Sequence, residues 1–155
     1  MIRIALYQPD IAQNTGTIMR LAACLGLGID IVEPSGFPVS DKAFRRAGMD
    51  YLDQVDWRRH DDFAAFETMR RSEHRRLVLM TTGAALPYTD FAYRNDDVLM
   101  AGRESAGVPP AVHAAADARI LIPMAPGLRS LNVAVATAMI AGEALRQTGT
   151  FPAAS

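Results

Sequence analysis

Cysteine, histidine and net charge are all scarce in this chain. Its 155 residues include one cysteine, Cys24, and three histidines, and the formal net charge is -1. A single cysteine excludes a disulfide framework and a cysteine-based zinc site within one chain. His60, His74 and His113 also lack metal-ligand spacing, so we predict no metal site. Because the charge is close to zero, we expect any nucleic acid to be bound through a local patch.

Long hydrophobic runs are missing as well. The opening stretch MIRIALYQPD lacks the apolar run of a signal peptide, and no stretch approaches the ~18 apolar residues of a membrane span. We therefore expect a cytoplasmic protein with no membrane partner. Half of the residues are apolar, which is enough for one core in a chain of this length. We predict a single domain over residues 1–150 and a frayed tail over residues 151–155.

Short apolar runs alternate with helical patterns along the chain. Continuous apolar runs predict strands, at residues 2–7, 29–34, 51–55, 77–82, 97–102 and 118–124. Apolar residues at helical spacing predict helices, at residues 15–25, 42–47, 61–71, 109–116 and 130–147. This alternation is typical of the α/β class. The expected architecture is a parallel sheet flanked by helices on both faces.

Three of the expected strands run into polar or glycine-rich loops in the second half of the chain. These loops read TTGAALP, GRESAGVP and PMAPGLRS. Ligands of open parallel sheets bind beyond the carboxyl ends of the strands, so we predict a ligand site within residues 80–132. Gly102 and Gly107 would let a ligand approach the backbone closely. Glu104 lies between them, as a ligand contact or as a solvated loop acid.

The start of the final helix carries more polar side chains than one cap needs. We expect Ser130 to cap this helix, which leaves Arg129 and Asn132 for a ligand. The free N–H groups of a helix N-terminus suit a carboxylate or a phosphate. Near the first helix, we expect Asn14 to lie in the preceding loop, as a cap or as a site residue. Arg20 would then reach back along that helix toward it.

Basic residues are concentrated in one segment. Nine of the sixteen lysines and arginines lie within residues 42–76, and eight acidic residues lie within residues 41–73. Such a segment is typical of an ion-paired surface. The alternative is a set of phosphate contacts at the edge of an RNA site.

Three segments, in order along the chain, resemble a known family. NTGTIMRLAACLG, LMAGRESAGVP and IPMAPGLRSLNVAVATAMIAGEALRQ are similar to the successive motifs of the SpoU branch of the SPOUT RNA 2′-O-methyltransferases. IVEPSGF, DKAFRRAGMDY and LMTT also resemble the TrmL type within that branch, which methylates the wobble nucleotide of tRNA. The resemblance implies a C-terminal trefoil knot and a homodimer whose active site is completed near the subunit interface. It also implies S-adenosylmethionine as methyl donor, S-adenosylhomocysteine as product and no metal.

The implied substrate is the ribose 2′-hydroxyl of a wobble cytidine or modified uridine in a tRNA anticodon stem-loop, with leucine tRNAs expected. By resemblance, the catalytic residues are Asn14, Arg20, Glu104, Ser130 and Asn132. The donor would contact Met80, Thr81, Gly102, Ile122, Ser130 and Leu131, and the RNA would contact Arg20, Arg45, Arg46 and Arg129. The proton acceptor stays open between Glu104 and Arg20, although a guanidinium holds its proton tightly.

Two positions depart from the family pattern. Arg103-Glu104-Ser105 stands where many relatives have Pro-Glu-Thr, and the residues 132–135, NVAV, stand where TrmL-type relatives often have NLSN. Alternative functions are 2′-O-methylation of another tRNA or rRNA position, or RNA binding by a non-catalytic knot protein. A flavodoxin-like or dinucleotide-binding protein is disfavoured because the glycine fingerprint and the phosphate loop are both absent.

Overall fold

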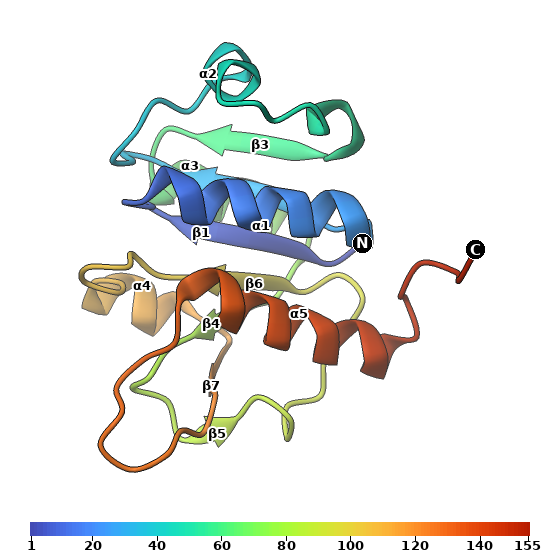
Figure 1. Ribbon diagram of the computed structural model, residues 1–155. Helices are drawn as coiled ribbons and strands as arrows, with labels where there is room; N and C mark the ends of the chain where they lie inside the picture. Colours follow the sequence, from blue (N-terminus) through green and yellow to red (C-terminus); the bar gives the residue numbers. More distant parts are fainter.

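Seven parallel strands form one sheet at the centre of the molecule, which a computed structural model describes over residues 1–155 (Figure 1). The strand order across the sheet is β3-β2-β1-β6-β4-β7-β5, and every pair of neighbours is parallel. The strands are β1 (Arg3–Tyr7), β2 (Gly28–Val32), β3 (Trp57–His60), β4 (Leu77–Met80), β5 (Leu86–Pro87), β6 (Val98–Ala101) and β7 (Ala118–Leu121). The predicted parallel α/β class is confirmed.

Helices cover both faces of this sheet (Figure 1). On one face lie α1 (Ala12–Leu25) and α5 (Val133–Thr148), and on the other lie α3 (Phe63–Ser72) and α4 (Pro110–Ala115). The short α2 (Asp41–Arg46) packs beyond β3. Each face therefore has its own core, because successive side chains of a strand point to opposite faces. In the central strand β6, Leu99 belongs to one core and Met100 to the other.

One predicted strand is wrong, and one observed strand was not predicted. Residues 51–55 form a 3-10 turn at Leu52–Gln54 instead of a strand, and the edge strand is Trp57–His60. Arg58 and Arg59 occupy the centre of that strand, so it lacks the apolar run that reveals a buried strand. The two-residue β5 at the opposite edge was not predicted, because one pair of residues carries no periodicity.

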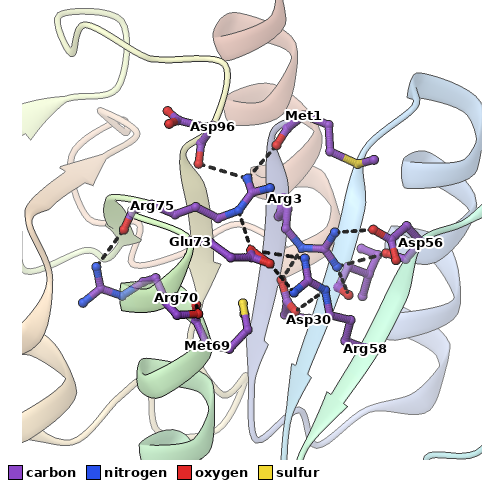
Figure 2. Close-up of polar contacts among 12 residues, drawn as sticks. Met1, Arg3, Asp30, Asp56, Arg58, Met69, Arg70, Glu73, Arg75 and Asp96 are labelled. Carbon is purple, nitrogen blue, oxygen red and sulfur yellow. Dashed lines mark hydrogen bonds and ion pairs between the residues drawn. The ribbon is translucent and has the colours of Figure 1, made fainter.

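A buried polar network joins the amino-terminal ends of β1 and β2 (Figure 2). The Arg3 side chain is 1% exposed; its Nε donates to Asp30 at 2.6 Å and its Nη1 to Asp56 at 2.7 Å. Burial of Asp30 favours its neutral form, but hydrogen bonds from His60 and Arg3 outweigh this and lower the pKa of Asp30. A buried charge that loses its partner is strongly destabilising, so these groups depend on one another.

Most basic residues of the segment 42–76 form ion pairs with acidic residues of the same chain. Figure 2 shows Glu73 accepting from Arg58 at 2.7 Å and from Arg75 at 2.9 Å. Seven of the nine basic residues within 42–76 form such pairs: Arg45, Arg58, Arg59, Arg70, Arg71, Arg75 and Arg76. These seven residues are ion-paired, as the interpretation of this segment expected, although Arg70 is buried instead of lying at the surface.

The last residues extend away from the sheet after α5 (Figure 1). The helix ends at Gly149, whose φ of 67° is the left-handed conformation of a typical helix stop, and residues 151–155 are exposed. None of the helices is long and apolar enough to cross a membrane.

Candidate functional site

A cavity of about 500 Å³ opens where the carboxyl ends of β4, β6 and β7 meet the start of α5. Its walls include Met80, Gly102 and Ile122, which lie at or just beyond the ends of the three strands. The loop between β7 and α5, orange in Figure 1, supplies Ser130 and Leu131. This is the edge of the sheet where a ligand was predicted, and twelve of the twenty-two lining residues are hydrophobic.

One wall of the cavity is a tight turn after β6. Arg103 and Gly107 exchange two backbone hydrogen bonds, at 2.9 and 2.8 Å, so the chain doubles back on itself. A Cβ atom on Gly102 would lie 2.8 Å from the backbone carbonyl carbon of Gly107. Gly107 itself has a φ of +66°, which favours glycine. These two glycines therefore let bare backbone face the cavity.

The start of α5 differs from the prediction. Ser130 does not cap the helix and makes no hydrogen bond within the chain. The cap is Asn132, whose Oδ1 accepts from the amides of Ala134 at 2.8 Å and Val135 at 3.3 Å. The helix starts three residues after Ser130, at Val133 (Figure 1), so Ser130 stays in the loop and its hydroxyl has no partner within the chain.

Asn132 also connects the two helices of this face. Its Nδ2 donates to Oδ1 of Asn14 at 3.1 Å. The prediction that Asn14 lies in a loop is wrong, because α1 begins at Ala12 and Ile11 precedes it without any side-chain cap. With no capping duty at its own helix, the Asn14 amide is free to face α5 and the cavity.

Glu104 and its neighbours tie the turn after β6 to the loop after β1. Glu104 Oε2 accepts from the backbone amide of Asp10 at 2.9 Å. Arg103 donates from Nε, at 3.1 Å, and from Nη2 to the Asp10 carboxylate, and Ser105 donates to it from Oγ and from its amide. These bonds from Arg103 and Ser105 lower the pKa of Asp10 to about 2.

The cavity collects most of the predicted site residues. All six residues expected to contact the donor line it: Met80, Thr81, Gly102, Ile122, Ser130 and Leu131. Among the five expected catalytic residues, Asn14, Glu104, Ser130 and Asn132 line it as well. Arg20 does not. It lies on α1 six residues after Asn14, so the expected convergence of these two side chains within one chain is wrong.

Arg20 instead borders a second cavity, of about 700 Å³, between α1 and the α2 region. Its guanidinium lies over the ring of Tyr51, 5.0 Å from the centroid, and Arg46 lines the same cavity. Arg45 is paired with Asp41 and Asp53 on the surface, at 2.7 and 2.6 Å. The fourth expected RNA contact, Arg129, is exposed in the loop before α5.

The family model of the SpoU rRNA methylases matches residues 1–142 of the chain. The chain belongs to this SpoU family. Similar SpoU proteins include the tRNA (cytidine(34)-2′-O)-methyltransferase of Beijerinckia indica, 65% identical over 146 residues, which cover 94% of this chain and 91% of that protein. The Escherichia coli protein of the same name is 40% identical over 156 residues, with 99% and 98% covered.

Solved SpoU structures share the fold. One, described under structural insights into the 2-OH methylation of C/U34 on tRNA, has a TM-score of 0.86 and 39% identity, covering 95% of both chains. An AdoMet-bound rRNA methyltransferase from Sinorhizobium meliloti has a TM-score of 0.82 and 30% identity. It covers 94% of this chain and 56% of that one.

Several other residues that line this cavity were not predicted from the sequence. Ala136, Thr137 and Ile140 of α5 line it, and their helical spacing was the available signal. The Thr137 Oγ1 is fully buried without a hydrogen-bond partner. Asp10 was also not predicted, although it lies three residues after the end of β1, in a loop at the sheet edge where ligands bind in this class of fold.

Proposed function

We propose that this SpoU-family protein is a tRNA 2′-O-methyltransferase of the wobble nucleotide, position 34, with S-adenosylmethionine as donor. The observation that carries the proposal is that one cavity unites the six expected donor residues with Asn14, Glu104 and Asn132. Two relatives at 65% identity are named tRNA (cytidine(34)-2′-O)-methyltransferase, which supports cytidine 34 as the target. The proposed substrate is therefore the anticodon stem-loop, with leucine tRNAs as the first candidates and the cytoplasm as the place of action.

The cavity suits this donor in size and in surface. Its volume, about 500 Å³, falls in the range of small-molecule sites. Its largely apolar walls fit an adenosine and a thioether, while the turn at Gly102 and Gly107 offers backbone groups for the polar edges. The unpartnered Thr137 hydroxyl is a further polar contact for a bound molecule. When bound, S-adenosylmethionine supplies an electrophilic methyl group and leaves as a neutral thioether.

The polar side chains at the mouth would orient the ribose. Asn132 is fixed by its two cap bonds and by its bond to Asn14, so both amides are held in place without a ligand. The Ser130 hydroxyl is unengaged and adjacent. Alignment of a hydroxyl with the methyl group is the main requirement of such a transfer, and pre-positioned amides meet it.

Glu104 is the proposed acceptor of the hydroxyl proton. Its Oε2 is engaged by the Asp10 amide, and its Oε1 has no partner within the chain. In a Glu104→Gln variant the amide oxygen can still accept from Asp10 while the basic group is lost. We expect a large fall in kcat with the donor Kd retained, and an unchanged kcat would exclude Glu104 as the base.

Arg20 would reach the cavity from a second subunit. Exposed apolar side chains surround the cavity mouth and the outer side of α5: Ile11, Leu131, Val135 and Met139 are 45%, 40%, 49% and 38% exposed. An apolar patch of this kind is typical of a protein interface. We therefore propose a homodimer through α1 and α5, in which Arg20 and Arg46 of one subunit bind RNA phosphates beside the cavity of the other. Arg45 and Arg129 would flank that path.

The trefoil knot is proposed on the same grounds as the donor. The segment between β4 and β6 lies against the end of α5, because Gln147 Oε1 accepts from the Tyr93 amide at 3.0 Å. The β7–α5 loop also lines one cavity with residues 80–82 and 101–108, two segments that precede it in sequence. Threading of that loop would hold the turn of Gly102 and Gly107 and the start of α5 around one cavity.

A methyl-transfer assay tests the proposed activity. Total tRNA from a strain lacking this protein would be incubated with enzyme and labelled S-adenosylmethionine, and the methylated nucleotide would be located by mass spectrometry. We expect one 2′-O-methyl group at nucleotide 34. Methylation elsewhere would favour the alternative target, and RNA binding without transfer would favour a non-catalytic knot protein.

Mixed dimers test whether Arg20 acts across the interface. Arg20→Ala and Asn132→Ala subunits, each inactive alone, would be unfolded and refolded together. If Arg20 completes the partner's site, each mixed dimer regains one intact site of two. If Arg20 serves its own subunit, the mixture stays inactive. Sedimentation of both variants checks that they still form dimers.

A further inference from the structure

The Asp10 carboxylate is the connection between the loop after β1 and the turn that walls the cavity. Four donor groups reach it from residues more than ninety positions away in sequence: Nε and Nη2 of Arg103, and the amide and Oγ of Ser105. In addition, the backbone amide of Asp10 donates a hydrogen bond to the Glu104 carboxylate. Every residue from Arg103 to Ser105 is therefore bonded to Asp10.

The backbone around Asp10 is itself packed against the loop after β2. Gly36, in the loop after β2, approaches so closely that a Cβ there would lie 2.7 Å from the Asp10 carbonyl oxygen. The Gly36 amide donates to the carbonyl of Pro9 at 2.9 Å. The Asp10 backbone is thus fixed at the end of the sheet. Its side chain therefore fixes the position of the turn after β6, to which it is hydrogen-bonded.

From this arrangement we propose that Asp10 is a positioning residue for the methyl-donor cavity. Asp10 does not line the cavity itself, but it bonds to Arg103 and Glu104, which do, in the turn that also contains Gly102 and Gly107. Its charge holds the Arg103 guanidinium and the Ser105 hydroxyl, so the turn keeps its backbone groups directed toward the donor. This inference rests on the proposed function, because it assigns Asp10 to the donor cavity.

Donor affinity, measured by calorimetry without tRNA, tests the proposal. We expect Asp10→Ala to raise the Kd for S-adenosylmethionine on the order of tenfold, because a displaced wall loses the orientation of the bound molecule. Asp10→Asn removes the charge and keeps one acceptor oxygen, so we expect a smaller rise. Arg103→Met should raise the Kd as well, and the double variant Asp10→Asn/Arg103→Met should add little to either single one, because both break the same contact.

Glu73→Gln is the matched control. Glu73 is also a carboxylate paired with arginine, with its pKa likewise lowered to about 2, but it lies at the amino-terminal edge of the sheet beside Arg58 and Arg75. Its loss should lower the melting temperature and leave the donor Kd unchanged. Asp10→Asn should raise the donor Kd in addition to any fall in melting temperature, whereas a purely structural role would change the melting temperature alone.

The outcomes separate the two proposals. If the wild-type protein does not bind S-adenosylmethionine, the proposed function fails. If it binds and Asp10→Asn and Arg103→Met bind equally well, the function stands and the role of Asp10 is wrong. If Asp10→Ala does not fold, the comparison of Asp10→Asn with Glu73→Gln still decides the question.

Discussion

A single added methyl group at Gly102 should distort one wall of the candidate donor cavity. The Cβ of Gly102→Ala would lie 2.8 Å from the carbonyl carbon and 2.9 Å from the Cα of Gly107. Both atoms belong to backbone that is fixed by the two hydrogen bonds between Arg103 and Gly107. Contacts of at least 3.4 Å are ordinary, so the turn must open by about 0.6 Å. Overpacking of this kind costs about 1–3 kcal/mol.

The displaced wall should weaken donor binding more than it weakens the fold. A shift of about 1 Å can cost on the order of 100-fold in rate, so for a smaller shift we expect the Kd for S-adenosylmethionine to rise on the order of tenfold. Calorimetry gives the Kd and thermal melting gives the stability. Gly83→Ala is the control, because its Cβ would find only the Thr81 hydroxyl, at 3.6 Å. Wild-type affinity in Gly102→Ala would refute the reasoning.

Three further predictions concern stability. Asn132→Ala should lose about 1 kcal/mol through the missing cap of α5, whereas Ser130→Ala should lose nothing in the same urea titration, because Ser130 bonds to no group of the chain. Arg3→Met should cost about 3–5 kcal/mol in urea unfolding, since the buried Asp30 charge would lose its closest ion-pair partner and keep only His60 and the more distant Arg58; a loss below 1 kcal/mol would contradict this. The pKa of Glu73 is lowered to about 2, chiefly by Arg58, so its contribution is complete above pH 4.5 and is lost as the pH falls through 2. The melting temperatures of wild type and Glu73→Gln should therefore converge between pH 4.5 and pH 2, and a constant difference would argue against these ion pairs.

Local sequence patterns predicted most of the parallel sheet, because buried strands need continuous apolar runs. They failed at β3, where the arginines of Trp57–His60 are satisfied by carboxylates brought from elsewhere in the fold. Arg58, for example, is paired with Glu73 and lies 3.7 Å from Asp30. Such partners leave no trace within the strand's own sequence.

In the candidate site as well, local patterns predicted some features, while contacts between distant segments were not predicted. The strand ends located the cavity, and the family motifs supplied its residues. Helix boundaries were misplaced because capping preference is local, whereas Asn132 is chosen by its bond to Asn14 on another helix. Asp10 and Arg103 could not be paired from sequence, since only the fold brings residues 93 positions apart together. The cavity that Arg20 borders could not be predicted either, because it depends on how α1 packs against the rest of the fold.

The candidate donor cavity is lined by residues from Ile11, near one end of the chain, to Ile140, near the other. A growing polypeptide therefore has no such chamber until nearly all of it has emerged from the ribosome and α5 has docked. A truncated product would be unable to take up a methyl donor, however well its first strands had paired. Binding of the donor would then stabilise only complete, folded molecules, because a ligand that binds the folded state alone adds to its stability.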